Sequence, residues 1–184
     1  MKALVLYDSL GGNTSKVAQR IHRTLQEADW VDSHLIKVEK VTELDFYEYD
    51  LLFLGSPVIA WGPTNAMRDL VMGRLRAYHG DRIRPSAPLR PGKFGVSFCT
   101  YSGTHIGVAE AIPLTKWFSS FLGHIGCQIL DEWHIPGEFH GQEEANVAGR
   151  LGDIRGRPNE ADLAEVENRV KGLLAGLDAW LKKT

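Results

Sequence analysis

The sequence has 184 residues, of which 43% are hydrophobic and 24% are charged, and its formal net charge at pH 7 is −2. This length fits a single domain with a sizeable core, and the composition excludes a disordered or fibrous chain. A charge balance this close to neutral gives no electrostatic reason to expect nucleic-acid binding.

Three sequence features that the chain lacks bear on its cellular location. No apolar run reaches the roughly 18 residues that a membrane-spanning helix needs, and residues 1–7 lack the longer apolar segment and cleavage site of a secretory signal. The two cysteines, Cys99 and Cys127, do not form a Cys-x-x-Cys motif. We therefore expect a cytoplasmic protein with reduced thiols and no membrane partner, and a structural disulfide is the alternative.

The first part of the chain alternates apolar runs with helical stripes. Residues 3–7 form a short apolar run typical of a strand buried on both faces. A turn cluster follows, and Val17, Ile21 and Leu25 then recur at four-residue spacing, which predicts one face of a helix. Residues 31–38 alternate imperfectly and predict a second strand at the edge of a sheet.

The rest of the chain continues this alternation. Thr64 or Asn65 is predicted to cap a helix that begins after a proline-containing turn. The predicted elements are a buried strand at residues 50–55, a helix at 67–75, strands at 94–99 and 127–130, a helix at 108–125 and a terminal amphipathic helix at 163–181. Continuation of the last strand to residue 135 is left open. Residues 136–158 are polar and glycine-rich and predict an insertion.

Five strands that alternate with helices favour a parallel sheet covered on both faces, because parallel strands need crossover connections. The handedness of these crossovers predicts a doubly wound, three-layer α/β sandwich in a single domain, residues 1–184. Ligands of such sheets bind at the carboxyl ends of the strands. We therefore expect the chemistry in the loops after the first, third and fourth strands.

The loop after the first strand carries the residues of an anion site. It runs through Ser9, Leu10, Gly11, Gly12, Asn13 and Thr14 to the start of the first helix. Unpaired backbone N–H groups and the helix dipole favour an anion there, and two glycines allow a close approach. The loop has no lysine or arginine, so we expect neutral donors, including hydroxyls and the Asn13 amide, to hold a dianionic phosphate. The alternative is an ordinary turn in which Asn13 or Thr14 caps the helix.

Residues 5–14 resemble the FMN phosphate-binding signature of flavodoxin-like proteins: two apolar residues, an aromatic, a variable residue, Ser or Thr, and a small-residue turn that ends in Thr. Gly11 departs from this pattern, because many flavodoxins have a threonine there, and the departure removes one hydroxyl. Residues 55–62 and 98–103 are similar to the second and third flavin loops of the family. The resemblance implies a flavodoxin-like fold, with a five-stranded parallel sheet of order 2-1-3-4-5, and FMN as the cofactor.

The resemblance also implies which residues hold the cofactor. The candidates on the three loops are Ser9, Leu10, Gly11, Gly12, Asn13, Thr14, Ser56, Pro57, Val58, Ile59, Ala60, Trp61, Gly62, Thr100, Tyr101, Ser102 and Gly103. Trp61 and Tyr101 are the candidates for stacking on the flavin ring, with local core packing as the alternative for both. Gly62 is the candidate for turning a peptide carbonyl toward the flavin N5, with a simple turn as the alternative. The backbone of residues 100–103 would hydrogen-bond the pyrimidine edge of the ring.

Two further clusters have competing interpretations. His134, Glu138 and His140 are candidate metal ligands, but they lack a metal-binding spacing, so a polar, partly exposed insertion is preferred to a metal site. Basic residues gather after the second loop and form either a solvated face or a docking patch for an acidic partner or a pyridine nucleotide phosphate. They are Arg74, Arg76, Arg82, Arg84 and Arg90. No catalytic triad or carboxylate pair can be assembled, so no catalytic residue is predicted.

The preferred function is low-potential electron transfer through bound FMN to protein partners, for which one exposed edge of the ring is enough. An alternative is an NAD(P)H-dependent, FMN-containing reductase of quinones or flavins. The weak net charge counts against a carrier, because flavodoxins are usually strongly acidic, and the lack of a recognisable nicotinamide-binding segment counts against the reductase. A third alternative is an interaction module that has lost FMN. The insertion at residues 136–158 is a candidate for covering the ring or for contacting a second copy of the chain.

Overall fold

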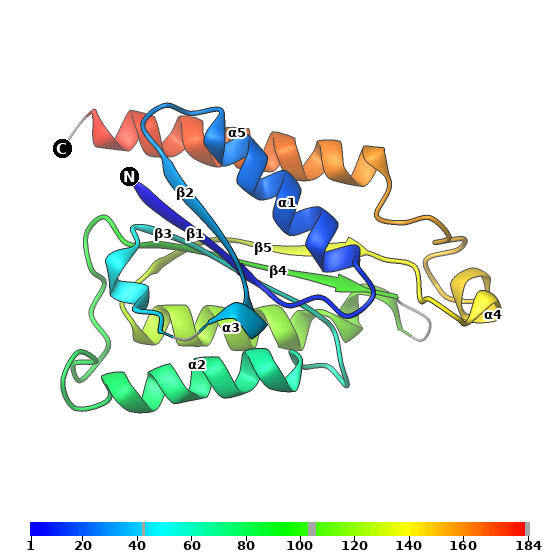
Figure 1. Ribbon diagram of the computed structural model, residues 1–184, viewed down its shortest axis with the longest axis horizontal. Helices are drawn as coiled ribbons and strands as arrows, with labels where there is room; N and C mark the ends of the chain where they lie inside the picture. The colour runs from blue at the N-terminus through cyan, green and yellow to red at the C-terminus, as the bar shows by residue number, and fades with distance from the viewer. Residues whose placement is uncertain (42, 103–105, 183–184) are drawn as a thin grey trace.

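Five parallel strands form one sheet at the centre of the molecule, in the order β2-β1-β3-β4-β5 (Figure 1). The computed structural model describes residues 1–41, 43–102 and 106–182. The strands are β1 (Lys2–Tyr7), β2 (Asp32–Lys37), β3 (Leu51–Pro57), β4 (Phe94–Tyr101) and β5 (Gln128–Pro136). The predicted parallel sheet and its strand order are confirmed.

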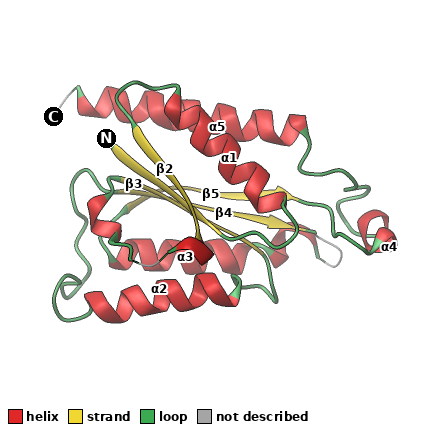
Figure 2. Ribbon diagram, viewed as in Figure 1, coloured by secondary structure: helices red, strands yellow, loops and turns green. Residues whose placement is uncertain are grey.

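Helices cover both faces of the sheet and make the molecule three layers thick (Figure 2). One face is covered by α1 (Asn13–Gln26) and α5 (Glu160–Leu181), and the other by α2 (Asn65–Tyr78) and α3 (Ile112–His124). The short α4 (Glu143–Val147) lies beyond the carboxyl ends of the strands. None of the helices within the described ranges is apolar over enough of its length to cross a membrane.

The packing explains why the central strands are continuous apolar runs. On β1, Ala3 and Val5 belong to the core under α1 and α5, whereas Leu4 and Leu6 belong to the core over α2 and α3. Successive side chains of a strand point to opposite faces, so a strand covered on both sides is apolar at every position. In contrast, β2 pairs with β1 alone and its side chains are half-buried or exposed, as expected of an edge strand.

One strand is longer than predicted, and another takes the longer of the two extents that were left open. β4 continues past residues 94–99 to Tyr101, and β5 continues past residues 127–130 to Pro136, so both reach the same edge of the sheet. The segment predicted as an insertion, residues 136–158, begins at that edge and contains α4. It therefore starts beside the loops that follow β1, β3 and β4, a position that the polarity of its sequence does not reveal.

One predicted helix is divided in two, and another is capped by one of the two residues predicted to cap it. The helix predicted at residues 108–125 is divided into a 3-10 turn, Gly107–Glu110, and α3. Pro113 lies in the first turn of α3, where its missing N–H needs no partner. At the start of α2, Thr64 is the cap, and its hydroxyl accepts the Met67 N–H.

Candidate functional site

A pocket of about 370 Å³ opens at the carboxyl edge of the sheet, the end toward which the strand arrows point in Figure 1. Its volume lies in the range of small-molecule sites. The residues that line it are Ser9, Leu10, Gly11, Asn13, Thr14, Pro57, Val58, Ile59, Thr100, Tyr101, Ser102, Gly137, Glu138, Phe139 and His140. Residues from all three predicted flavin loops therefore meet around one cavity, together with a fourth segment at residues 137–140.

The first loop presents a run of backbone donors. It is anchored at Ser9, whose N–H donates to the Asp8 carboxylate at 2.8 Å and whose hydroxyl accepts the Ser15 N–H at 3.2 Å. Gly12 has a φ of 92°, which glycine adopts at little steric cost, and the chain enters α1 directly after it. Among the described residues, no protein group accepts from the backbone N–H groups of residues 10–14. These donors lie at the positive end of the α1 dipole, which favours a bound anion.

The polar side chains at the end of this loop already have protein partners. The Thr14 hydroxyl is buried and lies 2.8 Å from the Thr100 hydroxyl, so one hydrogen of the pair is left to donate elsewhere. The Asn13 Nδ2 donates to the Glu138 carbonyl at 2.8 Å, while its Oδ1 is buried with no partner in the described part of the chain. Asn13 therefore joins the first loop to the segment after β5, a role that the sequence analysis did not predict.

The second loop begins with a residue that faces the core. The buried Ser56 hydroxyl donates to the Pro57 carbonyl at 2.9 Å and accepts the Thr64 N–H at 3.1 Å. Ser56 does not line the pocket, whereas Pro57, Val58 and Ile59 do. The Ser56 side chain thus shapes the loop and the start of α2.

The rest of this loop is a tight turn. Two backbone hydrogen bonds of 2.8 and 3.0 Å close it between Ile59 and Gly62. Its central residues, Ala60 and Trp61, have φ values of 45° and 63°. Positive φ at both central positions is typical of a type I′ turn, and it costs a non-glycine residue about 1–2 kcal/mol. The Gly62 carbonyl, which was predicted to turn toward a flavin, accepts the Ile59 N–H in this conformation.

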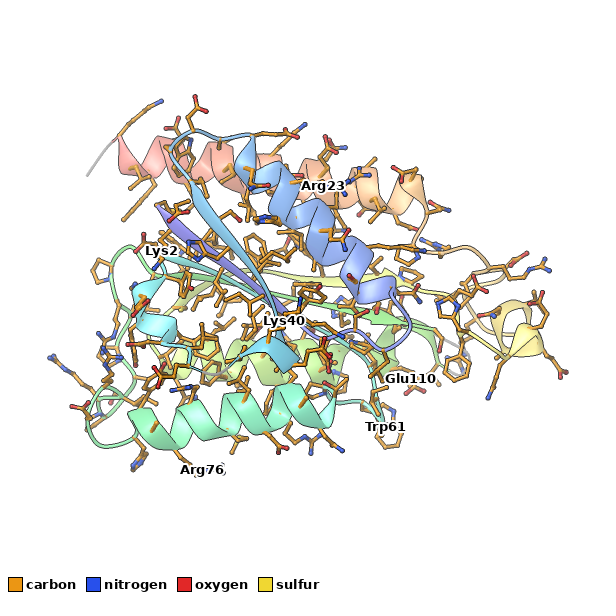
Figure 3. All side chains as sticks on the ribbon, viewed as in Figure 1. Lys2, Arg23, Lys40, Trp61, Arg76 and Glu110 are labelled. Carbon is orange, nitrogen blue, oxygen red and sulfur yellow. The ribbon has the colours of Figure 1, made fainter. Side chains whose placement is uncertain are left out.

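Trp61 points away from the pocket. It is 59% exposed, and its Nε1–H donates to the carboxylate of Glu110, in the 3-10 turn before α3 (Figure 3). Ala60, Trp61 and Gly62 are not among the residues that line the cavity. The hydrogen bond to Glu110 thus holds the indole at the rim, outside the stacking position that the sequence predicted.

The third loop contributes Thr100, Tyr101 and Ser102 to the pocket. Tyr101 is buried, and burial raises the pKa of its phenol. Its backbone carbonyl accepts the Gly137 N–H at 2.8 Å, which joins this loop to the segment after β5. Gly103, the remaining predicted residue of the loop, lies outside the described residues.

The segment after β5 forms a fourth wall, in the insertion that the sequence analysis considered as a cover for the ring without naming its residues. Phe139 and His140 line the pocket, and Phe139 is 43% exposed. The buried Asn146 side chain accepts the Phe139 N–H at 2.7 Å and donates to the carbonyls of Phe139 and Gln142 at 3.0 and 3.1 Å. The signal that could have found this wall is its position, because it follows a fifth strand at the ligand-binding edge of a parallel sheet.

The basic residues that were considered as either a solvated face or a docking patch lie at the opposite end of the strands, where β4 begins. Arg82 pairs with the Asp45 carboxylate. Arg82 and Arg90 both lie over the Tyr47 ring, with their guanidinium carbons 4.6 and 4.4 Å from its centroid. Lys93 lines a groove with Arg82 and Arg90 and comes directly before β4. The eight residues of β4 span about 26 Å and separate this basic patch from the pocket. The patch is therefore not part of the pocket.

The histidines considered as metal ligands have separate surroundings. Across the described residues, no group of three or more His, Cys, Asp or Glu side chains is placed to hold a metal ion. The His134 Nε2 lies 2.8 Å from the Thr115 hydroxyl of α3, and burial lowers the pKa of its imidazole. In contrast, His140 lies in the pocket wall.

One curated protein has a local sequence match to this chain, and no protein-family model matches it. The relative is a flavodoxin-like domain-containing protein, BilS, from Clostridioides difficile (strain CD3). It is 40% identical over 57 residues, which span 30% of this chain and 30% of that protein.

Solved structures match over nearly the whole chain. A flavodoxin from the domain Archaea has a TM-score of 0.64 over 92% of this chain and 94% of its own, at 20% identity. Oxidised Flavodoxin 1 from Bacillus cereus has a TM-score of 0.66 over 95% of this chain and 98% of its own, at 16% identity. Because identities this low report on architecture, these matches define the fold and leave the activity to be argued from the site. The chain has the flavodoxin-like fold that the resemblance of its first loop implied.

Proposed function

We propose that this chain binds FMN in the pocket at the carboxyl edge of the sheet and carries electrons to protein partners. The observation that supports this most directly is the run of backbone N–H groups at residues 10–14, at the start of α1, which have no acceptor among the described residues. Leu10 and Gly11 are exposed, but Gly12 and Asn13 are half-buried and Thr14 is buried. Donors that are shielded from water rarely go without an acceptor in a native protein, so the last three favour a bound anion.

The donor set suits the phosphate end of FMN. A terminal phosphate offers several acceptor oxygens and no obligatory donor, and the loop offers backbone N–H groups and hydroxyls. The Ser9 hydroxyl accepts from Ser15 and keeps its own hydrogen to donate, and the Thr14–Thr100 pair keeps one more. The α1 dipole adds about 0.3–1 kcal/mol for a negative charge at this position.

The other walls suit a flat aromatic ring. Pro57, Val58 and Ile59 form an apolar side, and Tyr101 and Phe139 add aromatic surface. Ile59 and Phe139 are 46% and 43% exposed, so a ring inserted between the loops would cover apolar surface that now faces water.

The chemistry of the lining favours a carrier over a reductase. FMN supplies the electron-transfer chemistry when bound, and the protein positions the ring and tunes its potential. The described residues that line the pocket include no lysine, arginine or cysteine. The basic patch, whose cations could pair with the phosphates of a pyridine nucleotide, lies about 26 Å away along β4.

Binding of flavin is the decisive test. The purified protein is titrated with FMN and with riboflavin, and quenching of flavin fluorescence gives both dissociation constants. We expect FMN to bind at least tenfold more tightly than riboflavin, because only FMN has the phosphate. A protein that binds neither flavin at micromolar concentration contradicts the proposal.

Anaerobic reduction then separates the two functions. A carrier accepts electrons from dithionite but shows no steady turnover of NADH or NADPH with a quinone or free flavin. Steady nicotinamide oxidation by the FMN-loaded protein would instead support the alternative, an NAD(P)H-dependent reductase.

A further inference from the structure

The imidazole of His140 lies across Gly11 in the first loop. A methyl group on Gly11 would be 2.6 Å from the His140 Cδ2 and 3.4 Å from its Nε2. The two residues are 129 positions apart in the sequence, yet both line the same pocket wall. The ring therefore occupies the space that a side chain at position 11 would fill.

The turn that carries His140 is fixed by hydrogen bonds on both sides. Asn146, 1% exposed, bonds both backbone groups of Phe139, the residue before His140. The Glu138 carbonyl accepts the Asn13 amide at 2.8 Å, and the Glu138 N–H donates to the Arg157 carbonyl at 2.8 Å. Hydrogen bonds therefore hold the backbone before His140 in place beside the first loop.

The ring nitrogens of His140 have no hydrogen bond or ion pair with any protein group in the described ranges. The nearest carboxylate along this turn, that of Glu138, is engaged with the Gly156 N–H at 2.8 Å. The neighbouring first loop has no lysine or arginine, and no group in the described part of the chain accepts from its backbone N–H groups at residues 10–14. An imidazole N–H is consequently available beside the anion site, at the position where the loop has no side-chain donor of its own.

We propose that His140 is a phosphate ligand of this site, and that its ring N–H takes the place of the side-chain donor missing at Gly11. The inference rests on the proposed binding of FMN. This role of His140 makes the segment after β5 part of the cofactor site. It adds an imidazole donor to the backbone N–H groups, the Ser9 hydroxyl and the Thr14–Thr100 pair. A hydrogen bond from an imidazole to a phosphate oxygen is charge-assisted, so its loss has a measurable effect on affinity.

The test compares FMN with riboflavin, which differs only in lacking the phosphate. His140→Ala is expected to weaken FMN binding about tenfold and to leave riboflavin binding unchanged. His140→Gln, which keeps an N–H donor of similar reach, recovers part of the loss. His124→Ala is the matched control, because this exposed histidine on α3 bonds only the Ser120 carbonyl, within its own helix.

The outcomes distinguish this inference from the function on which it rests. If the wild-type protein does not prefer FMN to riboflavin, the phosphate site itself is wrong. If the wild type prefers FMN and His140→Ala keeps the same ratio, only the role of His140 is wrong. An equal loss for both flavins would show that His140 acts on the ring or on folding, which also overturns the inference.

A double substitution supplies an independent check. Gly11→Thr in the wild-type background places a side chain against the imidazole and is expected to weaken FMN binding. In the His140→Ala background, the same threonine has room and adds a hydroxyl, so it is expected to strengthen FMN binding. Effects of Gly11→Thr that are equal in the two backgrounds would contradict contact between these positions.

Discussion

Polar groups are bonded differently at the two ends of the parallel strands. We call the end where the strands begin the amino edge, and the end where they stop the carboxyl edge. At the amino edge, the Asp45 carboxylate accepts from Arg82, from the Tyr47 N–H and from the Tyr78 hydroxyl, and the Lys93 Nζ donates to the carbonyls of Tyr47 and Tyr49. At the carboxyl edge, the backbone N–H groups of residues 10–14 have no acceptor among the residues that the structure describes.

This difference predicts that the amino edge contributes mainly to stability and the carboxyl edge mainly to ligand binding. Polar groups that bond one another contribute to the folding free energy, and they leave little for a ligand. The amino edge has one exception in the described part of the chain, the buried hydroxyl of Tyr47, which has no partner. We therefore expect substitutions at the amino edge to change stability, and substitutions at the carboxyl edge to change affinity for flavin.

Asp45→Ala tests the amino edge with the largest expected effect. The substitution leaves the Tyr78 hydroxyl, the Tyr47 N–H and Arg82 without their shared acceptor, so unfolding should become easier by about 2 kcal/mol. Urea denaturation measures this, with Glu165→Ala as a control that removes an exposed ion pair and costs under about 0.5 kcal/mol. A marked loss of FMN affinity in Asp45→Ala would break the distinction between the two edges.

The same carboxylate makes stability depend on pH. Burial alone would raise the pKa of Asp45, but hydrogen bonds from Arg82, Tyr47 and Tyr78 outweigh burial and lower it. Its folded pKa is thus below its unfolded value of about 3.9, so its contribution is present above that pH and is lost as the pH falls through the folded pKa. Denaturation between pH 7 and pH 3 should show a smaller loss in Asp45→Asn than in the wild type, and parallel curves would contradict this account.

Ala60→Gly probes the strained turn at the carboxyl edge. Glycine accepts a φ of 45° without the penalty that alanine has, so the variant should be more stable by about 0.5–1 kcal/mol. Ala164→Gly, in an exposed part of α5, is the matched control and should be less stable by about 1 kcal/mol. Thermal denaturation checks the opposite signs, and a destabilised Ala60→Gly would mean that the turn is not strained.

The smallest effect concerns two neighbouring apolar side chains at the rim. Ile59 lines the pocket and Trp61 is held outside it by Glu110. We expect Ile59→Ala to weaken FMN and riboflavin equally, by about threefold, because the lost contact is with the ring. Trp61→Ala should change either affinity by less than twofold. A larger effect of Trp61→Ala would show that the indole leaves Glu110 and stacks on the bound ring.

Local patterns were sufficient to predict most of the fold. The apolar run of β1, the paired glycines and the four-residue stripe of α1 are adjacent in the sequence, and each reports its own conformation. The five strands and their parallel arrangement follow from the same signals. The predicted β4 ended at residue 99, before the polar but buried Thr100. The continuation of β5 was left open, because its residues 131–136 mix buried side chains with half-buried and exposed ones.

The parts of the site that were missed depend on contacts between distant residues. The bond from Asn13 to Glu138 and the packing of His140 on Gly11 join positions more than 120 residues apart. The direction of Trp61 depends on Glu110, 49 residues later. No periodicity or short motif records such contacts, because they arise only when the strands have been ordered in the sheet.

The tie between Asn13 and Glu138 has a consequence for how the protein matures. During synthesis the first loop leaves the ribosome long before residues 137–140 exist, so a nascent chain has this loop without the fourth wall of the pocket. The cavity is complete only after the chain has passed Arg157, whose carbonyl holds Glu138. The four walls of the pocket can therefore meet only late in synthesis, when most of the chain has already been made.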